Sequence, residues 1–343
     1  MKAIAFTKAL PISDPVALRD IELDQPIAKG NDLLVKVSAV AVNPVDYKIR
    51  LNAPLEHGQP RVLGWDAVGE VVACGELATQ FKPGDKVFYA GELDRQGSNA
   101  EYQLVDQRIV GAKPKSLSEA EAAALPLTAI TAWELLFDHL AIEQQSPEDG
   151  RRSDEVILVV GAAGGVGSIL LQLARVITGA TIIATASRPS SQQWVEQLGA
   201  HHVIDHSQPL QPQIEALGLQ VTHVASLNST ESYFDSYIDL LPPFGKIALI
   251  DDPASLDAMK LKRKSLSLHF EFMYARSMFN AVDIDQQGKL LDSIADLIDS
   301  GFIKTTIGKN LGTINAENLR EAHRLLESGQ SIGKIVLTGF EPS

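Results

Sequence analysis

The chain has 343 residues, enough for two domains of ordinary size, and its 45% hydrophobic and 21% charged content is typical of a globular protein. A formal net charge of −13 argues against nucleic acid or an anionic membrane surface, so neither is expected as a partner. A single cysteine, Cys74, excludes an intramolecular disulfide, and a first segment without a long apolar core predicts a cytoplasmic protein.

Up to about residue 125, short apolar segments alternate with turn signals. The apolar segments are residues 2–6, 33–40, 68–72 and 85–89, and the turns between them contain Gly, Pro, Asn and Asp. This spacing predicts a compact, mostly antiparallel β domain. Residues 116–124 and 128–140 are predicted as two helices, the second with aromatic anchors at Trp133 and Phe137.

Residues 155–174 combine a strand, a tight turn and a helix. Residues 156–160 are all apolar, which is typical of a parallel strand buried on both faces. Gly164 and Gly165 would let the backbone approach a pyrophosphate, and Gly167 would let helix and strand pack closely. A membrane span is disfavoured by the glycines and the polar flanks. The sequence therefore predicts a dinucleotide turn, formed by Ala162, Ala163, Gly164, Gly165, Val166 and Gly167.

Beyond the turn, strands and helices are expected to alternate, as in a doubly wound parallel sheet. Helices are predicted over residues 191–198, 233–241, 289–298 and 319–326, and strands over 181–186, 203–205, 221–226, 246–250, 265–274 and 333–337. The segment 265–274 has apolar side chains on most alternate positions, so we expect it at the edge of the sheet.

The order of these elements resembles the medium-chain dehydrogenase/reductase superfamily over nearly the whole chain. The motifs are VNPVD at 42–46, LGWDAVG at 63–69, FKPGDKV at 81–87 and GSNAEY at 97–102. The nearest branch resembles the quinone oxidoreductase-like reductases, which are often labelled zinc-type alcohol dehydrogenases. The resemblance implies an α/β fold with a GroES-like, β-rich catalytic domain (1–125 and 280–343). It also implies a Rossmann domain with a doubly wound parallel sheet that binds NADP (126–279).

The zinc ligands of the alcohol dehydrogenases are not matched. Those enzymes carry cysteine where this chain has Asn43, histidine where it has Trp65, glutamate where it has Asp66, and a second cysteine near Leu127. A catalytic zinc needs three protein ligands, and only Asp66 could serve well. We therefore expect no metal, with Trp65 and Asp66 at the substrate pocket, although Trp65 could equally be a core side chain.

The end of the second strand of the dinucleotide unit distinguishes NAD from NADP. NAD-specific proteins usually place an acidic residue there, whereas this chain has Ser187 and Arg188 and no acid before Glu196. Ser187 can donate to a 2′-phosphate and Arg188 can neutralise it, which predicts NADP(H). The competing interpretation is that Arg188 is a solvated surface charge. Further cofactor contacts are expected at five residues. The resemblance, or a position at the carboxyl end of a strand, indicates Thr131, His206, Leu227, Ile250 and Asp251.

Without a metal, hydride transfer is limited to acceptors that stabilise their own charge. Quinones do so, as does a C=C bond conjugated to a carbonyl group. We therefore expect an NADPH-dependent oxidoreductase acting on such small molecules, with Tyr47 as candidate proton donor and Asn43 and Asp46 beside it. Tyr47 could also be a packed side chain at a domain edge. Two other functions stay open: a zinc-type alcohol dehydrogenase with atypical ligands, and a cofactor-binding protein without turnover.

The expected edge strand at 265–274 also bears on assembly. An uncovered edge offers unpaired N–H and C=O groups, and two copies could pair there antiparallel. The resembling reductases are usually dimers, so a homodimer is expected. The alternative is a monomer whose C-terminal helices cover that edge.

Overall fold

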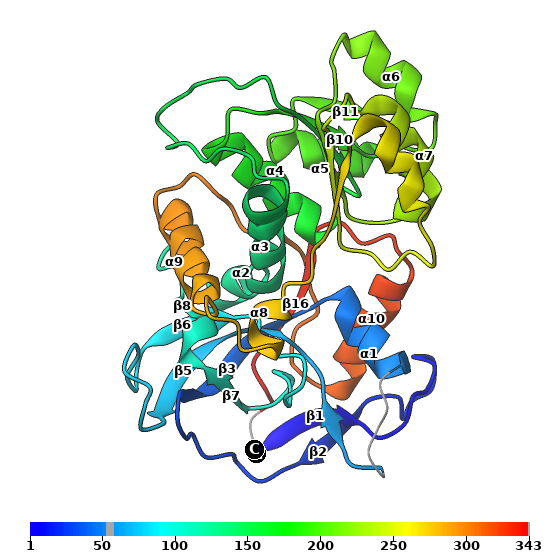
Figure 1. Ribbon diagram of the computed structural model, residues 1–343. Coiled ribbons are helices and arrows are strands. Elements are labelled where there is room, and N and C mark those ends of the chain that lie inside the picture. Colours follow the sequence, from blue (N-terminus) through cyan, green and yellow to red (C-terminus); the bar gives the residue numbers. More distant parts are fainter. Residues whose placement is uncertain (53–57, 342–343) are drawn as a thin grey trace. The chain divides into compact units, whose positions relative to one another are not determined.

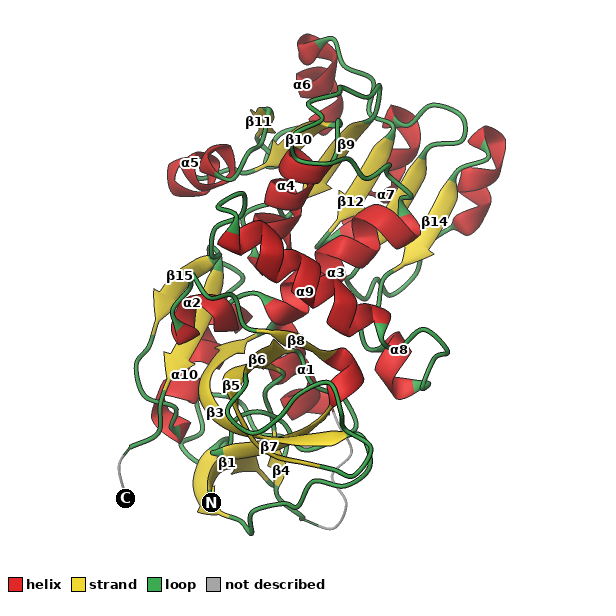
Figure 2. Ribbon diagram, turned by 90° about the vertical axis from the view of Figure 1, so that its left-hand side faces the viewer, coloured by secondary structure: helices red, strands yellow, loops and turns green. Residues whose placement is uncertain are grey.

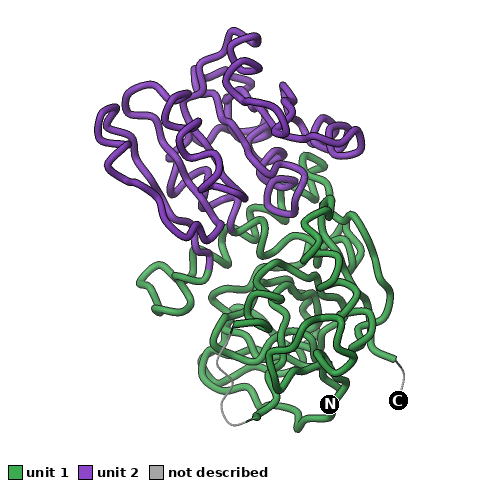
Figure 3. Tube along the Cα trace, turned by 90° about the vertical axis from the view of Figure 1, so that its right-hand side faces the viewer, with its two compact units in different colours: residues 1–130, 274–343 green, residues 131–273 purple. Residues whose placement is uncertain are grey.

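The computed structural model describes residues 1–52 and 58–341, which form two compact units (Figure 3). Unit 1 comprises residues 1–130 and 274–343, and unit 2 comprises residues 131–273. The predicted boundaries, at 125/126 and 279/280, differ from these by a few residues. Side-chain and backbone contacts explain the difference: the Leu127 N–H donates to Asp66 at 2.7 Å, and the Tyr274 ring packs edge-on against Trp65.

Unit 1 is built on antiparallel strands, as predicted. Its larger sheet has the order β15-β16-β3-β5-β6-β8, with β7 also paired to β3, and only β15 and β16 run parallel (Figure 1). These strands are β3 (Asp32–Val42), β5 (Asp66–Cys74), β6 (Lys86–Tyr89), β7 (Tyr102–Asp106), β8 (Val110–Ala112), β15 (Ile307–Asn310) and β16 (Lys334–Thr338). A smaller sheet contains β1 (Lys2–Phe6) between β2 (Arg19–Glu22) and β4 (Arg61–Val62).

The C-terminal part of the chain completes the larger sheet. β16 pairs antiparallel with β3, which places Ile335 opposite Val42, and β5 pairs with β3 so that Asp66 lies opposite Ala41. The ends of three strands that are far apart in sequence therefore meet at one place. The helices of unit 1 are α1 (Pro44–Asn52), α2 (Glu119–Ala123), the start of α3 (Pro126–Trp133), α8 (Ala275–Met278), α9 (Gln286–Asp299) and α10 (Ala316–Glu327), with the short 3₁₀ turn η1 (Gln107–Ile109).

Unit 2 contains one parallel sheet with the strand order β11-β10-β9-β12-β13-β14 (Figure 2). The strands are β9 (Val156–Val160), β10 (Thr181–Thr185), β11 (His202–Ile204), β12 (His223–Ser226), β13 (Lys246–Leu249) and β14 (Ser267–Phe270). Every residue of β9 is buried, in accordance with its position inside the sheet. This is the doubly wound order of a Rossmann fold, so the predicted fold class is confirmed.

Helices flank this sheet and supply part of its core. They are α4 (Gly165–Ile177), α5 (Pro189–Gln197), α6 (Leu210–Leu217), α7 (Thr230–Leu240), the π-helix η2 (Glu134–His139) and the 3₁₀ helix η3 (Ala258–Lys264). Phe234 and Tyr237 of α7 and Ile214 of α6 pack into one apolar cluster with the strands. Of the residues that the structure describes, none belongs to a helix long and apolar enough to cross a membrane.

Two predicted elements are corrected. The single helix expected over residues 128–140 is α3 followed by the π-helix η2. The strand expected over 265–274 is only Ser267–Phe270, because Ser265 has a left-handed backbone (φ 52°) and the partner strand β13 ends at Leu249, opposite Phe270. Its predicted place at the sheet edge is confirmed, and Phe270 is 63% exposed there.

Candidate functional site

The glycine turn of unit 2 has the geometry of an anion-binding turn. Gly161 has φ +81°, and a Cβ on Gly167 would lie 2.3 Å from the carbonyl oxygen of Ala162, so a side chain fits neither position without strain. Gly164 is the N-cap of α4 and brings no side chain to the first N–H groups of that helix. Those N–H groups and the helix dipole favour a negatively charged group, and the binding of a cofactor pyrophosphate here stays a prediction.

The Ser187–Arg188 pair follows the end of β10 after one residue, Ala186. Ser187 is half-buried and Arg188 is exposed at the start of α5. The backbone of Arg188 is fixed, because its N–H donates to the Ser191 hydroxyl at 3.2 Å and its carbonyl accepts from the same hydroxyl at 2.9 Å. Ser191 is thus committed to the cap of α5, and the contacts of Ser187 and Arg188 with a cofactor phosphate stay predictions.

The remaining candidate residues of unit 2 lie mostly at the carboxyl edge of its sheet. The Leu227 N–H donates to Val160 at 3.0 Å and the Ile250 N–H to Ser226 at 3.3 Å. Leu227 follows β12, which lies next to β9, and Ile250 follows β13, which lies next to β12. Asp251 has an additional role that the sequence did not indicate: it accepts from the backbone N–H of Thr230 at 2.8 Å and so anchors the start of α7.

The other two candidates, Thr131 and His206, do not lie at the ends of β12 or β13. Thr131 is buried within α3. His206 follows β11, and its carbonyl oxygen accepts from the Tyr233 hydroxyl at 3.1 Å. Their contacts with a cofactor stay predictions.

Unit 1 holds a buried polar cluster of Asn43, Asp46, Asp66 and Lys334. Asn43, Asp66 and Lys334 lie at the meeting point of β3, β5 and β16 and are at most 3% exposed. The Lys334 Nζ lies 2.9 Å from Asp66 Oδ2 and also donates to Asn43 Oδ1. The Asn43 Nδ2 donates to the same Asp66 oxygen at 2.8 Å, and the other Asp66 oxygen accepts from the backbone N–H of Leu127. Both oxygens of Asp66 are therefore engaged.

Asp46 is the second carboxyl group of this cluster and has no exposed surface. Its Oδ2 accepts from the Asn43 N–H at 2.8 Å, whereas its Oδ1 is buried without a hydrogen-bond partner among the described residues. The pKa of Asp46 is raised to about 7 in total: loss of hydration raises it most, the Asn43 N–H and Lys334 lower it, and the nearby Asp66 adds a smaller rise. Asp46 consequently carries a proton over much of the range below neutrality.

The aromatic residues near this cluster differ in their surroundings. Tyr47 is half-buried on α1. Trp65 is 1% exposed, donates from its indole nitrogen to the Glu92 carbonyl at 3.1 Å, and packs against Tyr274 at a ring-centre distance of 6.2 Å. Trp65 is therefore a packed side chain, and its place at a substrate pocket stays a prediction. Burial raises the pKa of Tyr274, and the nearby Asp46 and Asp66 carboxyls add to this, so its hydroxyl stays protonated.

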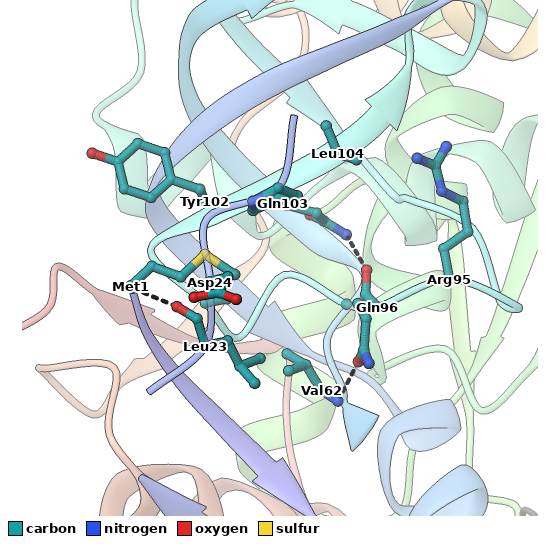
Figure 4. Close-up of a pocket in the computed structure, with 12 residues that line it drawn as sticks. Met1, Leu23, Asp24, Val62, Arg95, Gln96, Tyr102, Gln103 and Leu104 are labelled. Carbon is teal, nitrogen blue, oxygen red and sulfur yellow. Dashed lines mark hydrogen bonds between the residues drawn. The ribbon is translucent and has the colours of Figure 1, made fainter. Parts of the chain in front are cut away.

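Two other kinds of site could exist among the described residues: a metal centre and a cavity. Within residues 1–52 and 58–341, no three His, Cys, Asp or Glu side chains come together as a metal site. A cavity of about 450 Å³ lies elsewhere in unit 1, and none of the predicted site residues lines it (Figure 4). Two of its polar side chains are already engaged: Gln96 accepts from the Val62 N–H at 2.7 Å, and Arg95 pairs with Asp32 at 2.8 Å.

Known proteins are similar to this chain over its whole length. The family described as Alcohol dehydrogenase GroES-like domain matches residues 29–115, and the family described as Zinc-binding dehydrogenase matches residues 198–337. The Zinc-type alcohol dehydrogenase-like protein SACOL2177 of Staphylococcus aureus (strain COL) is 40% identical, over 98% of this chain and 99% of the relative. The chain belongs to the medium-chain dehydrogenase/reductase superfamily.

Members of this superfamily are oxidoreductases that bind a nicotinamide cofactor, and other members match as well. A Rhizobium etli CFN 42 protein classed with the zinc-dependent alcohol dehydrogenases has a TM-score of 0.94 and 51% identity, over 100% of this chain and 99% of that one. The 2-methylene-furan-3-one reductase of Solanum lycopersicum is 30% identical over 98% of this chain and 79% of the relative. Escherichia coli quinone oxidoreductase, solved with NADPH, has the same fold, with a TM-score of 0.82 and 23% identity over 98% and 100% of the two chains.

The sequence did not indicate two residues of this region in this superfamily member: Lys334 within the buried cluster, and Tyr274 beside it. The sequence predicts Lys334 only as part of a terminal strand, and Tyr274 only as an apolar position of an alternating strand. A signal for Lys334 was available: a lysine directly before the apolar run 335–337 must either reach solvent or find a buried partner. Tyr274 gave no such signal, because a tyrosine suits both a core and an edge strand.

Proposed function

We propose that this protein is an NADPH-dependent reductase of quinones or of C=C bonds conjugated to a carbonyl group, working without zinc. The observation that carries the proposal is the buried cluster of unit 1, where Asp66 is bonded to Lys334, Asn43 and the Leu127 N–H. When bound, the cofactor would supply the hydride, and the protein's residues would bind, orient and protonate.

The donor set around Asp66 does not suit a zinc ion. A catalytic zinc takes three protein ligands of the Cys, His, Asp or Glu type. Here the Trp65 indole N–H is a donor engaged with Glu92, and Asn43 and Leu127 replace the two thiolates. A dication beside Asp66 would also face the buried Lys334 ammonium at the same carboxylate, and this repulsion would oppose its binding.

NADPH is preferred to NADH in this proposal. The glycine turn at 161–167 would hold the pyrophosphate, and Ser187 with the exposed Arg188 would contact the 2′-phosphate. Arg188 suits this role because its guanidinium stays charged at every relevant pH and offers several N–H donors.

Proton transfer would use the polar groups beside Asn43. Hydride addition to a conjugated C=C bond leaves an enolate, which needs one proton. Tyr47 on α1 is the proposed donor because it is half-buried, whereas its neighbour Asp46 is fully buried and holds a proton near neutral pH. Asn43 would contact the reacting end of the cofactor or the acceptor.

The protein is proposed to act as a homodimer. β14 is an edge strand of the unit 2 sheet, and Phe270 on it is 63% exposed. Antiparallel pairing of two β14 strands would satisfy the free backbone groups of that edge and cover this ring.

The names of the Staphylococcus aureus and Rhizobium etli proteins favour a second candidate, a zinc-type alcohol dehydrogenase. One experiment separates the two. NADPH oxidation is followed with a panel of quinones and enones, with and without a chelator, and zinc is measured in the purified protein. We expect turnover that the chelator does not change and no stoichiometric zinc. Oxidation of alcohols by NADP⁺, measured in parallel, that is lost on chelation and comes without reduction of quinones or enones would establish the second candidate. No turnover with any substrate would leave a cofactor-binding protein.

A further inference from the structure

Lys334 is a buried cation whose hydrogen-bonding capacity is fully used. Its ammonium group has three N–H donors, and three acceptors lie within reach: the Val42 carbonyl at 3.2 Å, Asn43 Oδ1, and Asp66 Oδ2 at 2.9 Å. Its backbone is fixed as well, because the Lys334 N–H donates to Thr306 at 2.8 Å. A side chain with 3% exposure and three partners is held in one arrangement.

The carboxamide of Asn43 is oriented by this cation. Its Oδ1 accepts from Lys334, and its Nδ2 donates to Asp66 at 2.8 Å. The flipped amide would bring its NH₂ group against the ammonium and its oxygen against the carboxylate, which places like groups together at both contacts. Lys334 and Asp66 together therefore permit only one orientation of the amide.

The charge balance of the buried cluster also depends on Lys334. Two carboxyl groups, Asp46 and Asp66, face a single ammonium group. If that cation is removed, Asp66 becomes a buried carboxylate without a counter-ion, and such a group is strongly destabilising. Lys334 thus both orients the Asn43 carboxamide and neutralises Asp66. Neither contribution would remain if a neutral side chain of similar length replaced Lys334.

We propose that Lys334 is a positioning residue of the active site: it holds the Asn43 carboxamide in one orientation and supplies the counter-ion of Asp66. This inference rests on the proposed function, in which Asn43 contacts the cofactor or the acceptor. Lys334 itself acts through Asn43 and Asp66 and takes no part in hydride or proton transfer.

The test compares Lys334→Met with Lys334→Arg and with the wild type. Lys334→Met keeps the length and removes the charge, so we expect kcat with the best quinone or enone to fall about tenfold or more. The dissociation constant of NADPH, measured by fluorescence, should change less than about threefold, because the residues proposed to hold its phosphates lie in unit 2. Lys334→Arg should restore part of kcat, because it restores the charge. Lys86→Met is the matched control, since Lys86 forms an exposed ion pair with Glu70 in the same unit.

The proposal is overturned if Lys334→Met retains a kcat within about twofold of the wild type. Should this variant fail to fold, the comparison moves to Asp66→Asn combined with Lys334→Met, which leaves no buried charge uncompensated. A folded double variant with low kcat supports positioning, and one with wild-type kcat refutes it.

A measurement without turnover separates this inference from the proposed function. The side-chain amide protons of Asn43, assigned by ¹⁵N NMR with Asn43→Asp as reference, should exchange slowly in the wild type and fast in Lys334→Met. If none of the quinones or enones makes the wild type oxidise NADPH, the proposed function fails. Slow exchange that depends on Lys334 would still show that Lys334 holds the Asn43 carboxamide. Equal exchange rates of the Asn43 amide protons in the wild type and in Lys334→Met would show that Lys334 does not hold the Asn43 carboxamide.

Discussion

Replacing Asp46 by asparagine should remove a pH-dependent loss of stability. The pKa of Asp46 is 3.8 when unperturbed and about 7 in the folded protein, so the folded state binds the proton more tightly than the unfolded state. The free energy of unfolding therefore falls as pH rises between these two values and levels off above pH 7. At 1.36 kcal/mol per pH unit, the loss amounts to about 4 kcal/mol.

Asparagine imitates the protonated carboxyl group. Its amide oxygen can still accept from the Asn43 N–H, so the hydrogen bond at 2.8 Å is retained. The stability of Asp46→Asn relative to the wild type should thus increase by about 1.4 kcal/mol per pH unit between pH 4 and 7. Other titrating groups, such as the buried His323, contribute equally to both proteins and cancel in the difference.

The assay is denaturant unfolding of both proteins at half-unit steps from pH 4.5 to 8. Glu70→Gln is the control, since Glu70 is an exposed carboxylate of the same unit and removing it should change stability by less than about 1 kcal/mol at any pH. A difference between Asp46→Asn and the wild type that stays constant within about 0.5 kcal/mol over this range would refute the interpretation of Asp46 as a protonated acid.

Three other outcomes are expected. Arg188→Ala should weaken NADPH binding about tenfold and leave NADH nearly unchanged, because one charged hydrogen bond is worth roughly 1.5–3 kcal/mol; fluorescence titration that shows equal losses for both cofactors would contradict this. Elemental analysis should find no stoichiometric zinc, and one zinc per chain lost together with activity would contradict the metal-free proposal. Light scattering should give about twice the 37.0 kDa chain mass, and Phe270→Pro should return the mass of one chain by removing a ladder N–H; a dimer that survives this change must use another surface.

The sequence predicted those features that depend on local patterns. The apolar run 156–160, the glycines after it and the alternation of strands and helices each leave a periodic trace, and the fold class followed from them. Chain reversals and pairings over long distances leave no such trace. The shortened strand β14 depends on where β13 ends, and the π-helix η2 cannot be distinguished from an α-helix by spacing alone.

The candidate site was predictable in part for the same reason. Asn43, Asp46 and Asp66 lie in recognisable motifs, and the structure brings them together. Lys334 joins them only through the register of β16 against β3, which no local pattern specifies. The role of Asp251 at the start of α7 likewise depends on a contact between segments that are 21 residues apart.

The return of β16 to the first sheet has a consequence for how the chain is synthesised. Unit 2 is one continuous segment, residues 131–273, and can fold while later residues are still being made. Unit 1 cannot be completed in this way, because the cation that neutralises Asp66 lies 268 residues further along the chain. Until Lys334 has left the ribosome, the nascent β domain has two carboxyl groups to bury and no counter-ion for them. Its final closure must therefore come late, after Lys334 has been made, and ribosome-bound chains that stop before residue 334 should remain open to proteases around Asn43 and Asp66.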